Sequence, residues 1–302
     1  MKKLDLTIVI PTRNRSTILL KTLHVLKKNN FFFKEIIIVD SSDEFHKNKI
    51  KKSNITKKLN ITFLNSKPSA ALQRNVGLQN LKKKRKFIMF LDDDISFQKN
   101  AFKNMYYFIK NDNNSIGFGF NFKIKNISNI SEFIKKNKLT KFLGVYDVKD
   151  GVVTPSGWQT KAINLKKNQF VEWLPTGAVI YKYKYIGNLK FDTSYGRYSY
   201  LEDLDFSYSM KKKGDLIICS SAIFYTDNSG KRNQYQFGVK EIVNRYHFVN
   251  KFNLSKKYFF IGFILFLLKH FVNFLSFKPG FFFRIIGNLH GILKVVFRFN
   301  RL

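Results

Sequence analysis

The chain has 302 residues, carries a formal net charge of +34 at pH 7 and is 44% hydrophobic. Length and apolar content together exclude general disorder, and they predict one large domain or one domain with an appendage. The single cysteine, Cys219, excludes an internal disulfide framework and fits a reducing compartment. The N-terminus enters a strand pattern directly, without a signal-peptide apolar region, which predicts a cytoplasmic chain.

The positive charge comes almost entirely from lysines scattered along the chain. Such an excess points to nucleic acid or to an anionic membrane surface as a partner. No fingerprint of a nucleic-acid-binding module occurs, and the accompanying abundance of Asn, Ile and Phe indicates a broad compositional bias. Nucleic acid is therefore the disfavoured partner, and an anionic membrane surface is the favoured one.

The first 110 residues alternate between short apolar runs and segments of helical period. We expect strands at 6–10, 35–40, 60–64 and 87–91, and helices at 16–29, 69–81 and 98–110. Strands that alternate with helices in this way predict βαβ units and an α/β fold, with a mostly parallel sheet flanked by helices.

Polar clusters follow three of these strands: Thr12 with Arg13, residues 40–43, and residues 92–94. Ligands of such sheets bind outside the carboxyl ends of the strands, so we expect these clusters to converge on one crevice. This convergence predicts a binding site without relying on any single motif.

Three consecutive aspartates, Asp92, Asp93 and Asp94, follow the strand at 87–91. Neighbouring carboxylates repel one another by roughly 1 kcal/mol or more per close pair, so a positive group is expected beside them. Hard oxygen ligands suit Mg²⁺ or Mn²⁺, and such an ion commonly bridges to a substrate phosphate. The alternative interpretation of this segment is a solvated acidic turn.

The middle of the chain is harder to interpret. A strand is expected at 116–124, and residues 125–169 resemble a long insertion in which Trp158 belongs either to a lid on the acceptor side or to a packed anchor. Order returns at 171–180, where Gly177 allows close backbone approach to a ligand. A helix is expected from 201 to about 213, followed by a strand at 216–220. Glu202 and Asp203 lie in the first turn of this helix. They are either site residues or acids placed there because the helix dipole favours negative charge at a helix N-terminus.

A helix at 237–252 precedes two apolar segments that are separated by Pro279 and Gly280. The uninterrupted apolar run after Tyr258 is shorter than the roughly 20 residues that span a bilayer. Polar residues recur along one side of each segment, which predicts two basic amphipathic helices suited to a membrane interface. Packing onto the catalytic domain or a partner subunit, and a true membrane span, stay open as alternatives.

Six fragments, in this order, resemble glycosyltransferase family 2, the inverting nucleotide-sugar enzymes with a GT-A fold. The resemblance covers roughly residues 4 to 230. The fragments are Ile-Val-Ile-Pro-Thr-Arg-Asn-Arg (8–15), Ile-Ile-Val-Asp-Ser-Ser (37–42), Ala-Leu-Gln-Arg-Asn-Val-Gly (71–77), Phe-Leu-Asp-Asp-Asp (90–94), Trp-Leu-Pro-Thr-Gly-Ala (173–178) and Glu-Asp-Leu-Asp-Phe-Ser (202–207).

The resemblance assigns roles to matching positions. Asp92 and Asp94 would be the outer members of the DXD motif and hold Mn²⁺ or Mg²⁺ on the donor diphosphate, and Asp203, beside Glu202, would be the catalytic general base. The residues expected to bind the donor are Pro11, Thr12, Arg13, Asp40, Ser42, Arg74, Asp92, Asp93, Gly177 and Ala178. Acceptor contacts are expected from Trp158, Trp173 and Tyr200.

One position departs from the family pattern. Many relatives carry a His after the last sheet strand, and this chain has Thr226 there, with Asp227 as a nearby substitute.

Like-charge repulsion from Glu202 and Asp205 is expected to raise the pKa of Asp203. The expected domains are a catalytic domain at 1–235 and a membrane-associating helical region at 236–302.

The function that follows from the resemblance is an inverting hexosyltransferase. It would move a sugar from a nucleotide donor, with UDP favoured, to a glycan or lipid-linked acceptor in surface polysaccharide synthesis. It would work on the inner face of the cell membrane, and self-association through the C-terminal helices is left open. The alternatives are a catalytically inactive sugar-nucleotide-binding or scaffold protein and a nucleotidyltransferase, although residues 11–15 lack the Gly-rich phosphate loop of that class.

Overall fold

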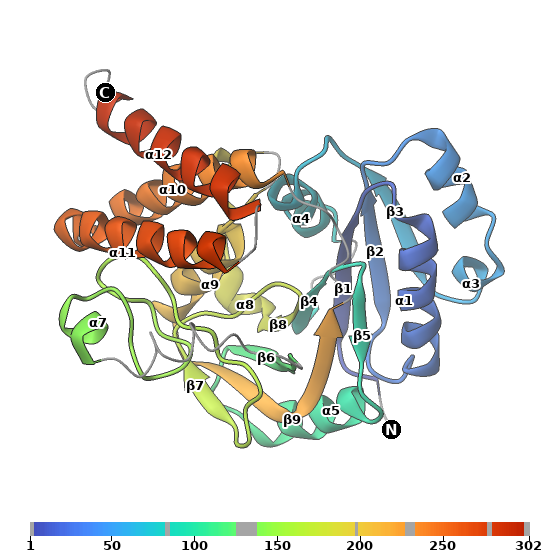
Figure 1. Ribbon diagram of the computed structural model, residues 1–302. Coiled ribbons are helices and arrows are strands. Elements are labelled where there is room, and N and C mark those ends of the chain that lie inside the picture. Colours follow the sequence, from blue (N-terminus) through green and yellow to red (C-terminus); the bar gives the residue numbers. More distant parts are fainter. Residues whose placement is uncertain are drawn as a thin grey trace. The chain divides into compact units, whose positions relative to one another are not determined.

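The computed structural model describes residues 3–81, 85–124, 138–196, 199–226, 233–276 and 280–298 (Figure 1). The chain divides into two compact units. Unit 1 comprises Met1–Ile124 and Ala162–Asn228, and unit 2 comprises Lys125–Lys161 and Ser229–Leu302. Of the insertion expected at 125–169, residues 125–161 thus group with the C-terminal helices and residues 162–169 with unit 1. The division at residues 235 and 236 stays a prediction.

Unit 1 is built on one mixed sheet with the strand order β3-β2-β1-β4-β8-β6-β9-β5, and β7 pairs with β9. Strands β1 to β4 are parallel, whereas β8 runs antiparallel to both β4 and β6. The strands are β1 (Leu6–Thr12), β2 (Glu35–Asp40), β3 (Ile61–Asn65), β4 (Phe87–Leu91), β5 (Ile95–Phe97), β6 (Gly117–Phe122), β7 (Gln169–Val171), β8 (Ala178–Lys182) and β9 (Leu216–Thr226).

Helices cover both faces of this sheet, so the mixed, mostly parallel α/β fold expected from the sequence is confirmed. One face packs against α1 and α5 through Leu23 and Phe102, and the other packs against α4 and α9 through Ala71 and Phe206. The helical segments are α1 (Ser16–Lys28), α2 (Glu44–Lys51), α3 (Asn54–Lys57), α4 (Ala70–Gln79), α5 (Ala101–Asn111), α8 (Tyr183–Ile186), the 3-10 helix η1 (Thr193–Tyr195) and α9 (Glu202–Lys211).

Strand β1 shows why an uninterrupted apolar run forms here. Ile8 belongs to the core under α1, and its neighbour Val9 belongs to the core under α4. Side chains alternate along a strand, so a strand covered on both faces is buried at every position and mostly apolar. The whole of β1 is accordingly buried.

Helix α4 lies unusually close to β1. A Cβ atom added to Gly77 would lie 2.4 Å from Cγ1 of Val9, closer than non-bonded carbons approach. This close approach fixes the height of α4 above the sheet, and with it the residues one turn earlier, Gln73 and Arg74.

The second half of unit 1 differs from the sequence-based expectation in its strand limits. The strand expected at 216–220 continues to Thr226, because β5 pairs along its extension. The stretch 171–180, where order was expected to return, holds the end of β7 and the start of β8. Pro175, which lacks the N–H that a sheet ladder requires, lies between them.

Unit 2 contains four described helices: α7 (Lys138–Phe142), α10 (Gln234–Lys251), α11 (Lys256–Leu275) and α12 (Gly280–Arg298). Trp158 anchors its core. The indole stacks on Phe259 with ring centroids 5.6 Å apart, the Arg245 guanidinium lies 5.0 Å from it, and only 6% of Trp158 is exposed. By length and composition, α11 and α12 would each suffice to cross a membrane.

Candidate active site

The three polar clusters expected to converge do meet at the carboxyl ends of β1, β2 and β4. Thr12 and Asp40 are direct partners in the β1–β2 register. Across to β4, the Thr12 hydroxyl donates to Oδ2 of Asp93 at 2.7 Å. Parallel strand order therefore brings residues some 80 positions apart into one group of contacts.

Arg74, on α4, joins this group to the start of α9. Its Nη1 donates to Oε1 of Glu202 at 2.5 Å, and its Nη2 donates to Oδ1 of Asp92 at 2.7 Å. The arginine is 3% exposed, so its pair with the buried Glu202 is shielded from water, whereas the Asp92 side chain is 37% exposed. One buried guanidinium thus holds two of the acidic motifs together.

A second arginine binds the other two aspartates of the triplet. Nη1 of Arg15 donates to Oδ1 of Asp93 at 3.2 Å and to Oδ2 of Asp94 at 3.0 Å. Arg15 itself is 45% exposed at its side chain. The positive charge expected beside the triple aspartate is supplied by the chain's own arginines.

Asp93 is the most enclosed of the three aspartates. Besides the contacts from Thr12 and Arg15, its backbone carbonyl accepts from the Thr22 hydroxyl at 2.7 Å. Burial is the main reason why the pKa of Asp93 is raised to about 6. Its partners lie on β1 and α1, which gives Asp93 the geometry of a residue that locks the loop after β4.

Glu202 and Asp203 open α9, directly after Leu201, whose φ of +80° is in the left-handed region. Burial, with Asp203 and Asp92 adding repulsion, raises the pKa of Glu202 to about 8 against the opposing effect of Arg74. Burial also raises the pKa of Asp203. The expected rise is present, but the like charge among its leading causes is Asp92, not Glu202 or Asp205.

The remaining predicted donor residues on β1 and β2 line the same ends. Pro11 is buried and Arg13 is exposed. The Asp40 carboxylate accepts from the backbone N–H of Ser42 at 2.8 Å, and the Ser42 hydroxyl accepts from the N–H of Asn14 at 2.7 Å. Asp40 and Ser42 therefore shape the loop as well as bordering the site.

Gly177 and Ala178 lie beside the aspartates. Ala178 pairs with Leu91, and the Gly177 carbonyl accepts from the N–H of Asp92 at 3.0 Å. Of the predicted acceptor residues, Trp173 is 7% exposed and Tyr200 is partly exposed, both in unit 1. Trp158 is buried in unit 2, as the packed-anchor alternative describes.

Two contributors were missed from the sequence. Arg15 was quoted only as part of a motif, and Gln73 was not singled out. The Gln73 amide donates to the carbonyls of Thr12 and Val39, at 2.9 and 2.7 Å, and so ties the ends of β1 and β2 together. Charge balance was the available signal for Arg15, since three adjacent carboxylates require cations nearby.

The side chains near the aspartates show whether the site could bind a divalent ion. Among the described residues, no group of three or more His, Cys, Asp or Glu side chains is arranged to hold a metal. Asp92 and Asp94 are carboxylates of the kind and number that Mg²⁺ typically takes from a protein, beside waters and substrate phosphates, and each accepts a hydrogen bond from an arginine here. Thr226 pairs with Ile95, beside Asp94, and Asp227 lies outside the described residues.

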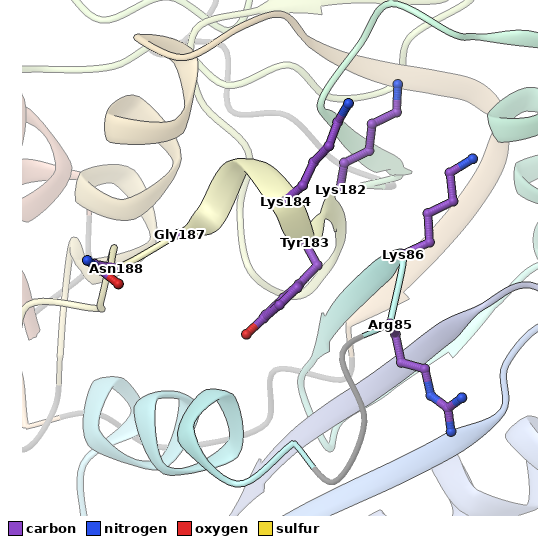
Figure 2. A pocket seen from close by; sticks show the side chains of 7 residues that line it. All are labelled: Arg85, Lys86, Lys182, Tyr183, Lys184, Gly187 and Asn188. Carbon is purple, nitrogen blue, oxygen red and sulfur yellow. The ribbon is translucent and has the colours of Figure 1, made fainter.

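A basic cavity of about 570 Å³ lies at the opposite end of β4 (Figure 2). It is lined by Arg85, Lys86, Lys182 and Lys184, among others, and Lys182 pairs with Phe87 at the start of β4. Because 54 of the 302 residues are Lys or Arg, basic side chains around a cavity are expected from the composition alone and do not by themselves indicate a binding site.

The sheet, its order and the acidic strand ends define a nucleotide-sugar type of α/β transferase fold, and comparison with known proteins agrees. Residues 7–170 match the sequence profile of glycosyl transferase family 2, and the chain belongs to this family. A search of curated proteins finds no match.

Solved structures share the fold at low sequence identity. A mannosyltransferase from Pyrobaculum calidifontis, PcManGT, in complex with GDP-Man and Mn²⁺, aligns with a TM-score of 0.57 and 11% identity, over 97% of this chain and 88% of its own. TarS of S. aureus, residues 1–349 with UDP-GlcNAc, aligns with a TM-score of 0.53 and 16% identity, over 82% of this chain and 66% of its own. In a longer TarS structure, only 41% of that chain is covered. These likenesses confirm the GT-A glycosyltransferase fold.

Proposed function

We propose that the chain transfers a sugar from a nucleotide-sugar donor to a hydroxyl group of a glycan or lipid-linked acceptor, with inversion at the anomeric carbon. The observation that carries this proposal is the buried Arg74, which unites Asp92, after β4, with the acidic start of α9. This link supports a site in which Asp92 would serve the donor and Asp203, beside Glu202, would serve as the base.

On the donor side, Asp92 and Asp94 would hold Mn²⁺ or Mg²⁺. When bound, such an ion neutralises the charge that develops on the departing nucleoside diphosphate. PcManGT was solved with GDP-Man and Mn²⁺, and TarS with UDP-GlcNAc. These ligands support a nucleotide-sugar donor, and they leave the choice between uracil and guanine as the donor's nucleobase to be determined. Our sequence-based preference is UDP.

On the acceptor side, Asp203 would accept the proton of the attacking hydroxyl. A single displacement inverts the anomeric carbon, so the base must lie on the face opposite the leaving diphosphate. Asp203 is partly exposed, and the N–H of Leu204 donates to its Oδ1 at 2.8 Å, which orients the carboxylate. A raised pKa makes it a stronger base than an ordinary aspartate.

Glu202 would act as a positioning residue. Its bond to Arg74 fixes the guanidinium between the two acidic motifs. Trp173 and Tyr200 are the acceptor candidates on unit 1, and of these only Tyr200 is partly exposed, whereas Trp158 belongs to the core of unit 2 and is left out of the proposed acceptor surface. A cytoplasmic donor pool and a lipid-linked acceptor would place the enzyme in surface polysaccharide synthesis, on the inner face of the membrane.

The substitution Asp203→Asn tests the proposed base. We expect transfer to fall by about 10²-fold or more, because general base catalysis is lost while shape is kept. Donor binding, measured by calorimetry with a nucleotide sugar and Mn²⁺, should be unchanged. The matched control is Asp215→Asn, an exposed aspartate paired with Lys211 just beyond the end of α9. Unchanged transfer by Asp203→Asn would contradict the assignment.

A further inference from the structure

Unit 2 packs α12 directly onto α10 through glycines. A Cβ atom added to Gly287 would lie 2.2 Å from the carbonyl oxygen of Tyr235, and one added to Gly238 would lie 2.5 Å from that of Arg284. Gly291, one turn after Gly287, repeats this approach on Val239. Small residues spaced in this way let two helix backbones touch, so α12 is held against α10.

The polar side chains of α11 and α12 point into this helix packing. Glu241, on α10, accepts from Nη2 and Nε of Arg284 at 2.8 and 3.1 Å, and Nε2 of His270 lies 3.5 Å from its Oε2. Asn288 donates to the Gly238 carbonyl at 2.9 Å and is fully buried. Of the polar stripes expected from the sequence, Asn273 and Asn288 are buried inside unit 2 and Arg284 is partly buried there, whereas Ser276 and Lys294 are exposed.

The opposite side of α11 and α12, which we call the outer face, is apolar and exposed. Each of its side chains is between 38% and 68% exposed. They are Phe260, Ile264, Leu268, Phe271, Val272, Leu275, Phe282, Phe283, Ile286, Leu289, Leu293, Val296 and Phe297. Monomeric soluble proteins rarely expose many large apolar side chains together, and α11 and α12 contact each other, so this face is expected to have a partner.

Charge identifies the partner. Residues 251–302 contain nine lysines or arginines and no aspartate or glutamate. A second copy of the chain would present the same positive charge and repel, whereas an anionic lipid surface attracts it. Exposed apolar side chains together with a net positive charge are what amphipathic helices use at an anionic bilayer interface.

The packing of α12 on α10 also limits how far α11 and α12 can insert into a bilayer. A pair of spanning helices would draw α10 into the hydrocarbon, since α12 is in backbone contact with it. Helix α10 carries Lys240, Glu241, Arg245 and Lys251, and charges in the bilayer core are costly. Binding along the surface leaves α10 outside the hydrocarbon.

We propose that the outer face of α11 and α12 lies in the surface of an anionic lipid bilayer, with both helices parallel to the membrane plane. This inference concerns unit 2 and does not depend on the proposed transfer reaction. Binding of a nucleotide sugar is measured without vesicles, and binding to vesicles is measured without a nucleotide sugar. Failure of the proposed transfer reaction and failure of the proposed membrane surface are therefore distinguishable.

The test is co-sedimentation of the full chain with vesicles of phosphatidylcholine, with and without phosphatidylglycerol. We expect binding to the anionic vesicles, weakened by salt. Leu268→Glu and Leu293→Glu should each weaken it about tenfold or more, because each takes an apolar side chain out of the bilayer. Phe45→Glu is the control, since Phe45 is 72% exposed on α2 in unit 1. Thermal unfolding of each variant verifies that it is folded.

Three results would overturn the proposal. The first is no binding to anionic vesicles, and the second is binding that Leu268→Glu leaves unchanged. In the third, protein in vesicles resists extraction at alkaline pH, as a spanning pair would. Concentration-dependent self-association in lipid-free buffer that Leu268→Glu abolishes, together with no vesicle binding, would assign the outer face to a second copy instead.

Discussion

Two arginines each pair with two carboxylates at the candidate site. Arg74 pairs with Asp92 and Glu202, and Arg15 pairs with Asp93 and Asp94. The carboxylates could be predicted from the sequence, because they follow apolar strands or open a helix. Their partners could not, because 54 cations compete for them and only the folded topology brings two of these close.

Truncating Arg74 should therefore destabilise unit 1. Arg74→Ala leaves the buried Glu202 without its hydrogen-bond donor, and a buried polar group left without a partner costs about 1–3 kcal/mol of unfolding free energy. Urea denaturation measures this loss. Lys211→Ala, which breaks the exposed pair with Asp215, should cost less than about 1 kcal/mol. Equal losses in both variants would contradict the assigned role.

The pH dependence of activity follows from the raised pKa of Asp203. A general base works only when deprotonated, so kcat/KM should fall as the pH drops through this pKa. Since burial raises the pKa from its ordinary value of 3.8, the acidic limb should lie above pH 3.8. A pH profile of kcat/KM measures it. A limb at or below the ordinary value would show that another group acts as the base.

At the scale of elements, the parallel half of the sheet was predictable and the rest only in part. Strands β1, β2 and β4 are apolar on both sides, and each was expected within two residues of its observed limits. The short β5 and β7 are three residues long, which is too short to show a period. Their pairing with β9 is a tertiary effect that local sequence does not encode.

The contact between α4 and β1 offers a test at this scale. Gly77→Ala should destabilise unit 1 by about 1–3 kcal/mol, because the new methyl group overlaps Val9. Val9→Ala opens space at the same point, so the double variant should lose less than the sum of the two single losses. Urea denaturation of all four proteins completes the cycle. Strict additivity would mean that the close approach is not what restricts position 77.

At the scale of the whole molecule, the chain combines a GT-A sheet with a helical unit whose polar side faces inward. The amphipathic period of the C-terminal helices was visible in the sequence, but which side packs was not, because period alone does not say what lies opposite. The assignment of Trp158 was equally open. Its partners Arg245 and Phe259 are about 90 to 100 residues later in the chain.

The central claim is that unit 1 binds a nucleotide sugar with a divalent ion. The most direct measurement is thermal stabilisation of the full chain by a panel of UDP and GDP sugars, with Mn²⁺ and with chelator. We predict that at least one donor raises the Tm with Mn²⁺ present, by an amount that grows with its concentration, and that Asp92→Asn with Asp94→Asn removes this effect. No stabilisation by any nucleotide sugar, with or without metal, would contradict the account.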